Sequence, residues 1–405
     1  MIYQFYEMQR AAWAPVALAA EATRLVADTL FALPNGHRLG RAAAAACEIL
    51  ARTTRQHRNV AFDIANVVID GVPVAVEQRI AASLPFCTLR HFARKTRRRD
   101  PALLVVAPLS GQFSALLNDA VRTLLEAHEV YLTDWHDARE VPRAAGPFDL
   151  DGYIDYLIGF LRKLGPDLHV VAFSQSTVPT LAAAALLARA GDAAEPRTLT
   201  LVAGPLDTRV NSTPSQLLAA RQPRSLFEAT MISRVPLGYR GAGRRVLPGF
   251  VQLAGYISHN LGRHMDAHWD FFGRLLDGDL EGAEAHRRFY DRFFSVLDLP
   301  AEFFLATLTN VFQEHRLARG TMAWRGLPVD TRLLRRPALL TIEGGLDDVS
   351  APGQTRVAHE LCPAIPSTRR AHHLEPAAGH LALFYGHHWR QAIAPRIAAF
   401  IREHA

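Results

Sequence analysis

The stretch from Leu168 to Ala190 most constrains how this chain can fold. It opens with an apolar, partly β-branched run that ends at Phe173, which is typical of a buried parallel strand. An alanine-rich run from Leu181 to Ala190 follows and favours a helix. Ser174 lies at the junction, so the sequence predicts a strand, a sharp turn and a helix, with a serine in the turn.

A serine on such a turn is a candidate nucleophile. Its hydroxyl would be exposed at the carboxyl end of the strand, beside helix N–H groups that can stabilise an anion, as in a nucleophile elbow. That motif usually has glycine two positions before and after the serine, where this chain has Ala172 and Ser176. Both residues are small, but the pattern is common, and a serine that only caps a helix fits it as well.

Apolar runs of strand length alternate with helical segments around this stretch. The predicted strands before and after it are 101–108, 130–135 and 198–203, and the other predicted helices are 114–128 and 151–164. This alternation indicates an α/β class protein with a doubly wound, mostly parallel sheet. A further strand at 337–343 and a final helix at 391–404 resume the pattern near the end of the chain.

The chain divides into four predicted parts. Residues 1–90 are expected to form an N-terminal helical segment and a β-hairpin that pack on the core, with Pro34-Asn35-Gly36 between two helices and Asp70-Gly71 in the hairpin turn. Residues 91–209 are the first part of the core. Residues 210–330 are helical and rich in aromatic residues, which we interpret as an inserted cap over the strand ends, with a minority of its aromatics lining an apolar cleft. Residues 331–405 are the second part of the core.

An aspartate and a histidine late in the chain complete a candidate triad. Asp347 follows the strand that ends at Glu343, and His380 lies in a loop of small residues before the last helix. Ser, Asp, His is the chain order expected of the α/β-hydrolase fold. His380 would take the proton of Ser174 as the serine attacks a carbonyl, and Asp347 would orient the imidazole. Asp348 is the alternative, because the local pattern does not distinguish two adjacent carboxylates.

An oxyanion hole is the second requirement of this chemistry. In α/β hydrolases one N–H donor comes from the loop after an early strand and the other from the residue after the nucleophile. The early donor would be Leu109 or Ser110, and the later donor would be Gln175. An ordinary turn that contains glycine accounts for the early loop equally well.

Charge and cysteine content argue against other classes of protein. The formal charge is +6, and the densest basic cluster, from Arg94 to Arg99, is not joined to aromatic platforms or a reading helix. We therefore expect a solvated loop there and no nucleic-acid partner. The three cysteines are too few and too scattered for a disulfide framework and fit a reducing compartment; they are Cys47, Cys87 and Cys362.

Metal and membrane functions are also disfavoured. The histidine pairs at 372–373 and 387–388 lack the helical i, i+4 spacing of a metal site, so we expect no metal and no cofactor. No apolar run approaches the roughly 20 residues that span a bilayer. The N-terminus has no secretory pattern, and we expect a cytoplasmic protein without a transmembrane segment.

Eight stretches are similar, in sequence and in order, to one family of enzymes. They are 61–64, 105–111, 131–139, 204–209, 248–250, 288–291, 297–303 and 343–348. In these stretches the chain resembles the intracellular polyhydroxyalkanoate (poly-3-hydroxybutyrate) depolymerases over essentially its whole length. The resemblance implies an α/β hydrolase that cleaves a storage polyester at the surface of cytoplasmic granules. It also implies a triad of Ser174, Asp347 and His380, which favours the first of the two aspartates.

One departure from this family concerns the nucleophile. The family often has cysteine where this chain has Ser174, and proline where it has Ser176. Serine suits hydrolytic ester cleavage better than thiol-dependent acyl transfer. We therefore predict a serine hydrolase that cleaves poly-3-hydroxybutyrate, or a related polyester, to hydroxy acid monomers or oligomers through an acyl-enzyme. The alternatives are a general carboxylesterase on small or oligomeric esters and a non-catalytic granule-surface protein, and homo-oligomer formation stays open.

Overall fold

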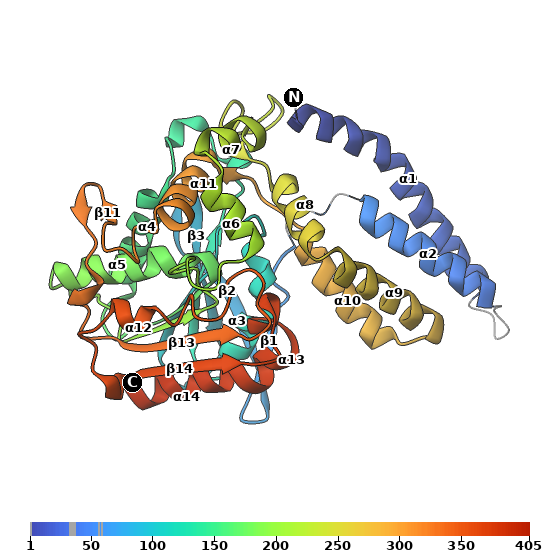
Figure 1. The fold of residues 1–405 in the computed structure, drawn as a ribbon. Helices are drawn as coiled ribbons and strands as arrows, with labels where there is room; N and C mark the ends of the chain where they lie inside the picture. Colours follow the sequence, from blue (N-terminus) through green and yellow to red (C-terminus); the bar gives the residue numbers. More distant parts are fainter. Residues whose placement is uncertain (1, 32–37, 56, 58–59) are drawn as a thin grey trace.

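A nine-stranded sheet forms the centre of the molecule in the computed structural model, which describes residues 2–31, 38–55, 57 and 60–405 (Figure 1). The strands, in spatial order, are β1 (Asn66–Ile69), β2 (Val72–Leu84), β3 (Cys87–Arg94), β5 (Glu129–Trp135), β4 (Ala102–Val106), β6 (His169–Phe173), β7 (Thr198–Val202), β13 (Ala338–Gly344) and β14 (Arg370–Glu375). Strands β5 to β14 pair in parallel, whereas β1, β2 and β3 form an antiparallel extension.

Helices cover both faces of the parallel part of the sheet. The helices α3 (Asn118–Leu124) and α14 (Ala394–His404) contact each other on one face, and α4 (Leu150–Leu164) and α5 (Thr177–Arg189) contact each other on the other. Every residue of β6, β7 and β13 is buried, which explains why apolar residues predominate in these strands. The predicted doubly wound, mostly parallel sheet of the α/β-hydrolase fold is therefore correct.

Three local predictions differ from the structure. The helix expected at 114–128 is a 3₁₀ turn, Ser114–Leu117, followed by the short α3. Strand β14 was not predicted, because its polar sequence lies at the sheet edge, where its residues are only partly buried. The basic cluster is not wholly solvated, since Arg94 is buried at the end of β3 and its guanidinium lies 2.8 Å from the carboxylate of Asp100.

The segment between β7 and β13 is largely helical, and we refer to it as the cap. It contains α6 (Pro214–Arg221), α7 (Arg224–Met231), α8 (Gly249–His259), α9 (Leu261–Asp277), α10 (Leu280–Phe293) and α11 (Ala301–Thr307), with short strands at Ser233–Arg234, Arg245–Leu247, Leu299–Pro300, Ala323–Trp324 and Leu327–Pro328. Helix α8 lies over the carboxyl ends of the parallel strands, where the hydroxyl of Tyr256 donates to the carbonyl of Ser110 across 3.5 Å. The cap therefore lies over the edge of the sheet at which Ser174 lies.

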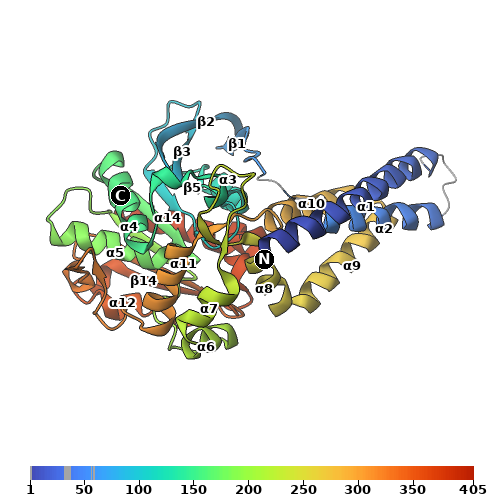
Figure 2. The same cartoon turned by 90° about the horizontal axis from the view of Figure 1, so that it is seen from above.

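The N-terminal helices α1 (Ile2–Phe31) and α2 (Arg38–Thr54) lie beside the cap helices α9 and α10. Together they form an arm that projects away from the sheet (Figures 1 and 2). Arg287 of α10 forms a salt bridge with Glu48 of α2 across 2.6 Å, and Arg52 of α2 forms another with Asp291 across 2.8 Å. The sequence predicted that residues 1–90 pack on the core, but only the hairpin joins the sheet, whereas the two helices contact the cap.

The start of α1 is tied to the body of the molecule by one buried side chain. The hydroxyl of Tyr3 donates to Asp298 Oδ2 across 2.8 Å, and the Tyr3 ring is almost fully buried. The predicted separator Pro34-Asn35-Gly36 lies outside the described residues. In the part of the chain that the structure describes, no helix is both long and apolar enough to cross a bilayer.

Candidate active site

Ser174 occupies a strained turn between β6 and α5. Its φ angle is +52°, in the left-handed region that non-glycine residues rarely adopt and that recurs at functional sites. The turn is held by Ser176, whose hydroxyl lies 2.8 Å from the carbonyl oxygens of both Val106 and Phe173. The predicted strand, sharp turn and helix are therefore present, and the hydrogen bonds of the Ser176 hydroxyl stabilise the turn.

Small residues around the turn allow its close packing. Ala172 is completely buried in β6, and the Thr177 hydroxyl donates to the carbonyl of Ser174 across 2.8 Å. Gly204, just after β7, lies so close to Thr177 that an added Cβ would overlap the threonine side chain. A larger residue at position 204 would therefore displace the first turn of α5 and, with it, the serine.

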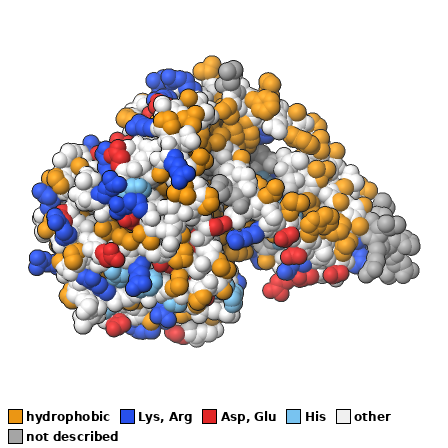
Figure 3. All heavy atoms as spheres, viewed as in Figure 1, with side chains coloured by type: hydrophobic (Ala, Val, Ile, Leu, Met, Phe, Trp, Pro, Cys, Tyr) orange, Lys and Arg blue, Asp and Glu red, His pale blue; other side chains and the backbone are white. Residues whose placement is uncertain are grey.

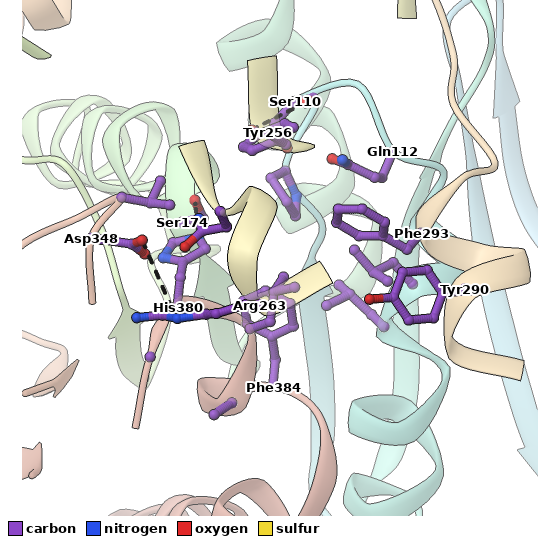
Figure 4. Close-up of a pocket in the computed structure, with 18 of the residues that line it drawn as sticks. Ser110, Gln112, Ser174, Tyr256, Arg263, Tyr290, Phe293, Asp348, His380 and Phe384 are labelled. Carbon is purple, nitrogen blue, oxygen red and sulfur yellow. Dashed lines mark hydrogen bonds and ion pairs between the residues drawn. The ribbon is translucent and has the colours of Figure 1, made fainter. Parts of the chain in front are cut away.

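The three residues predicted as a triad lie together. His380 Nε2 is 3.1 Å from Ser174 Oγ (Figure 4). His380 Nδ1 is 2.8 Å from Asp347 Oδ2. The second oxygen of Asp347 accepts hydrogen bonds from the backbone N–H groups of Val349 and Ser350, at 2.8 and 2.9 Å. These contacts hold the carboxylate in one orientation and leave one oxygen for the imidazole.

Asp348 has a different environment. Its carboxylate faces Arg263 of α9 across 3.9 Å, and 41% of its side-chain surface is exposed, against none for Asp347. Asp347 is therefore the aspartate that contacts His380, while Asp348 is partly exposed and lines the space beside Ser174.

A pair of glycines brings the aspartate turn against the histidine loop. An added Cβ at Gly344 would overlap the carbonyl of Ala378, and one at Gly345 would overlap the carbonyl of Pro376. The backbone N–H of Leu346 donates to the Ala378 carbonyl across 3.0 Å. Because the two loops follow the neighbouring parallel strands β13 and β14, this close approach places Asp347 beside His380.

The pKa of His380 lies above the usual value for histidine. Burial of the imidazole lowers this pKa, but the charge and hydrogen bond of Asp347, together with the charge of Asp348, raise it by more. In the neutral ring, Nδ1–H donates to Asp347 and leaves the lone pair of Nε2 directed at Ser174. This tautomer can accept the serine proton.

Two of the three predicted oxyanion donors border the space beside Ser174. Ser110 lines it together with Ser174, whereas the Leu109 side chain is buried beneath the loop. Gln175 is the second residue of the 3₁₀ turn, and N–H groups in a first helical turn have no intrahelical acceptor. The structure thus brings Ser110 and Gln175 to the serine from two different loops.

Two apolar cavities meet at Ser174 beneath the cap. The first, of about 350 Å³, is lined by His380 and by cap aromatics that include Tyr290 and Phe293 (Figure 4). The second, of about 340 Å³, is lined by Gln175 and by Phe304 and Phe312. The sequence predicted that some cap aromatics line a cleft, but it did not indicate which ones, because only the path of the cap decides which of its rings face the serine.

Three cap residues near the serine were missed by the sequence analysis. Tyr256, Gln252 and Arg263 lie on α8 and α9 and line these cavities. They belong to no local motif that marks a site, and no signal in the sequence separates them from the other polar residues of the cap.

A comparison with protein families decides the identity of the chain. Residues 203–405 match the family model described as PHB de-polymerase C-terminus, where PHB stands for poly-3-hydroxybutyrate, and this match covers half of the chain. The chain belongs to the PHB depolymerase family. The PHB depolymerases are ester hydrolases, so this chain is an ester-cleaving enzyme, and the resemblance inferred from the sequence is confirmed.

Solved structures similar to this PHB depolymerase family member include lipases and esterases. They include a putative lipase of Acinetobacter baumannii AYE (14% identity, 81% of this chain and 93% of that chain covered, TM-score 0.41) and a monoacylglycerol lipase of Paleococcus ferrophilus (12%, 76% and 96%, 0.46). A thermophilic esterase of Thermogutta terrifontis is also similar (15%, 82% and 99%, 0.44). No protein with a curated description matches the sequence.

Proposed function

We propose that this enzyme is a serine-type depolymerase of poly-3-hydroxybutyrate, or of a closely related polyhydroxyalkanoate. The observation that carries the proposal is the chain of contacts from Ser174 through His380 to Asp347, on a strained turn beneath an apolar cap. In this assignment Ser174 is the nucleophile, His380 the general base and acid, and Asp347 the group that orients the imidazole.

Acylation begins when Ser174 Oγ attacks the carbonyl carbon of the ester. The hydroxyl proton moves to His380 Nε2, and the carbonyl oxygen becomes an oxyanion. The N–H groups of Gln175 and of Ser110 or Leu109 stabilise that oxyanion. When the tetrahedral intermediate collapses, the bond to the alcohol oxygen breaks, and that oxygen leaves with the proton from His380. The product of this step is an acyl-enzyme on Ser174.

Deacylation repeats these steps with water as the nucleophile. A water molecule gives one proton to His380 Nε2 while its oxygen attacks the acyl carbon. The bond to Ser174 Oγ then breaks, and the proton on His380 returns to the serine. A hydroxy acid, or an oligomer that ends in a carboxyl group, is released, and the free enzyme is restored.

The lining of the site supports an uncharged, largely apolar substrate. Both cavities at Ser174 are predominantly apolar, which suits a polyester whose only polar groups are ester oxygens. Small esters fit the same space, so a general carboxylesterase is the second candidate function. A non-catalytic granule protein would not require the contacts among Ser174, His380 and Asp347.

Under this proposal the enzyme works at the surface of cytoplasmic polyester granules, and the arm is the part that contacts the polymer. Large apolar side chains of α1 are exposed at Phe5 (65%), Met8 (67%) and Leu18 (73%). Hydrophobic side chains are visible along the arm in Figure 3. Trp269 of α9 is exposed to a similar degree, at 67%. A group of exposed apolar side chains of this size is typical of a contact surface.

The test of the proposed chemistry is the Ser174→Ala variant. We expect it to lose hydrolysis of both amorphous poly-3-hydroxybutyrate granules and p-nitrophenyl butyrate, measured by released acid and released phenolate. Ser83→Ala, an exposed serine on β2, is the matched control and should keep full activity. A serine-directed phosphonate should inactivate the enzyme, and a thiol-alkylating reagent should not. Granule hydrolysis by Ser174→Ala at the native rate would contradict the assignment.

Substrate class is tested separately with the native enzyme. Rapid hydrolysis of granules favours the depolymerase, whereas activity restricted to p-nitrophenyl butyrate favours the carboxylesterase.

A further inference from the structure

We infer that the substrate chain extends through the site on both sides of Ser174, with its acyl part in one cavity and its alcohol part in the other. The enzyme would then cleave inside a polyester chain and not only at its end. This inference rests on the proposed ester hydrolysis at Ser174. Beyond that proposed function, the inference assigns a cavity to each half of the substrate and names the residues that line it.

The two cavities meet around Ser174 and extend from it in different directions. Six residues line both of them: Ser110, Ser174, Tyr256, Asn260, Asp348 and Val349. Tyr256 lies on α8, and Asn260 directly follows that helix, so the end of α8 spans the place where the cavities meet. A chain that reaches Ser174 therefore has space on each side of its reacting carbonyl. We call the two spaces the histidine-side cavity, which His380 lines, and the glutamine-side cavity, which Gln175 and Gln252 line.

The chemistry assigns one half of the substrate to each cavity. The departing alcohol oxygen must take its proton from His380 Nε2, so the alcohol part belongs in the histidine-side cavity, the one that His380 lines. Gln175 lines only the glutamine-side cavity, and its N–H is a proposed donor to the carbonyl oxygen of the acyl part. The acyl chain therefore extends into the glutamine-side cavity.

The cavity volumes suit more than one repeat unit on each side. A four-carbon hydroxy acid unit has about six non-hydrogen atoms, and it fills at most about 180 Å³ if each atom takes the ~30 Å³ of a water molecule in the liquid. The cavities have volumes of about 350 and 340 Å³. Each can thus hold roughly two units.

One polar atom in the glutamine-side cavity is suited to a polyester. Gln252 Nε2 is buried, and it donates to no acceptor among the residues that the structure describes. The side chain packs directly over Gly111, where an added Cβ would lie 2.9 Å from Gln252 Cδ. A polyester backbone offers acceptors at every repeat and no donors, so an ester carbonyl of the acyl chain is a suitable partner for this amide.

Two series of esters separate the cavities in an experiment. In the first series the leaving group is always p-nitrophenol, and the acyl part grows from acetyl to oligomers of one to three 3-hydroxybutyrate units. In the second series the acyl part is always acetyl, and the alcohol part grows through the same oligomers, capped as methyl esters. Values of kcat/KM are measured for each member with the native enzyme and the variants below.

Each cavity can be narrowed by one substitution in its wall. Ala219 lines only the glutamine-side cavity, and Ala219→Trp should lower kcat/KM about tenfold for the longer acyl chains of the first series while the second series is unchanged. Leu116 lines only the histidine-side cavity, and Leu116→Trp should do the reverse. The neighbouring Ala220 is exposed and lines neither, so Ala220→Trp is the matched control for added bulk on α6.

A third variant removes a hydrogen-bond donor without adding bulk. Gln252→Leu should lower kcat/KM several-fold more for acyl chains of two or more units than for p-nitrophenyl acetate. This variant keeps the proposal testable if a tryptophan variant does not fold, which circular dichroism would show. With amorphous granules, the native enzyme should release oligomers early, before the monomer predominates.

The inference is overturned if Ala219→Trp and Leu116→Trp each change kcat/KM equally in the two series. It is also overturned if none of the variants Ala219→Trp, Leu116→Trp and Gln252→Leu changes kcat/KM for any substrate. It is also overturned if the native enzyme releases only monomer from the first time point. Ser174→Ala serves as the reference in every assay. Activity retained by that variant would refute the proposed function itself, whereas loss of activity together with equal effects in the two series would refute only the assignment of cavities.

Discussion

Replacement of Asp347 by asparagine tests the orientation of His380 most directly. One oxygen of Asp347 accepts two backbone N–H groups, at 2.8 and 2.9 Å, and the other accepts His380 Nδ1–H. In Asp347→Asn the amide oxygen would keep the two backbone donors, so its NH₂ group would face the imidazole. An NH₂ group cannot accept Nδ1–H, and the neutral ring would change to the tautomer with its proton on Nε2. That tautomer cannot accept the proton of Ser174.

The expected loss in kcat is about 10⁴-fold, as when the corresponding aspartate of a serine protease triad is replaced by asparagine. This factor corresponds to about 5 kcal/mol of transition-state stabilisation. The fold should be retained, because the asparagine keeps the hydrogen bonds to Val349 and Ser350. Initial rates with p-nitrophenyl butyrate give kcat, and a thermal melt verifies folding.

Asp348→Asn is the matched control, because it removes the same charge one residue further on. Asp348 raises the pKa of His380 through its charge and forms no hydrogen bond with it. We expect kcat near the native value at pH 8, together with an acid limb of the pH–rate profile that moves to lower pH. The acid limb moves in this direction because the reaction requires neutral His380. A lower pKa of His380 keeps the ring neutral in more acidic solution. Equal losses in the two variants, or a native rate in Asp347→Asn, would refute the reasoning.

Three further predictions concern the structure around the site. Gly204→Ala should destabilise the protein by about 1–3 kcal/mol and reduce activity, whereas Gly159→Ala, on an open face of α4, should be neutral or stabilising in the same thermal melts. Tyr3→Phe removes the hydrogen bond to Asp298 and should lower the free energy of unfolding by about 1–3 kcal/mol in urea titrations, and an unchanged value would contradict the role of this contact as an anchor. Cys362 is buried, which raises its pKa to about 12, so it should stay unlabelled by iodoacetamide at pH 8 in native protein, as mass spectrometry would show.

Much of the core, and the three side chains that the structure brings together at Ser174, could be predicted from local pattern. Buried parallel strands need continuous apolar runs, and the alternation of such runs with helices identified the sheet that the structure contains. Ser174, Asp347 and His380 were selected because each lies at a junction after a strand or before a helix, in one chain order. Each of these signals extends over only a few residues, so it can be recognised in the sequence without knowledge of the tertiary fold.

Other features depend on contacts between distant segments and left no local signal. Strand β14 is polar and lies at an edge, so its existence follows only from pairing with β13. The local pattern did not separate Asp347 from Asp348, and before the structure only the family resemblance favoured Asp347. The path of the turn is what brings Asp347 into contact with His380. The packing of α2 against the cap helix α10 likewise includes salt bridges between residues more than 200 positions apart.

The sequence by itself determined the class of fold, the serine turn and the three candidate groups that can act on an ester. The spacing of apolar residues and the size of the residues around the turn are visible in short segments, and the order of the three groups along the chain is visible without the structure. The tertiary structure alone decided that Asp347 contacts His380, that α8 covers the serine and that a separate cavity opens on each side of it. The physical reason is that a cavity is bounded by side chains from many segments. The shape of a cavity cannot be inferred from any one of these segments. Tyr256 and Gln252 could therefore be identified as cavity-lining residues only from the position of the cap over the strand ends.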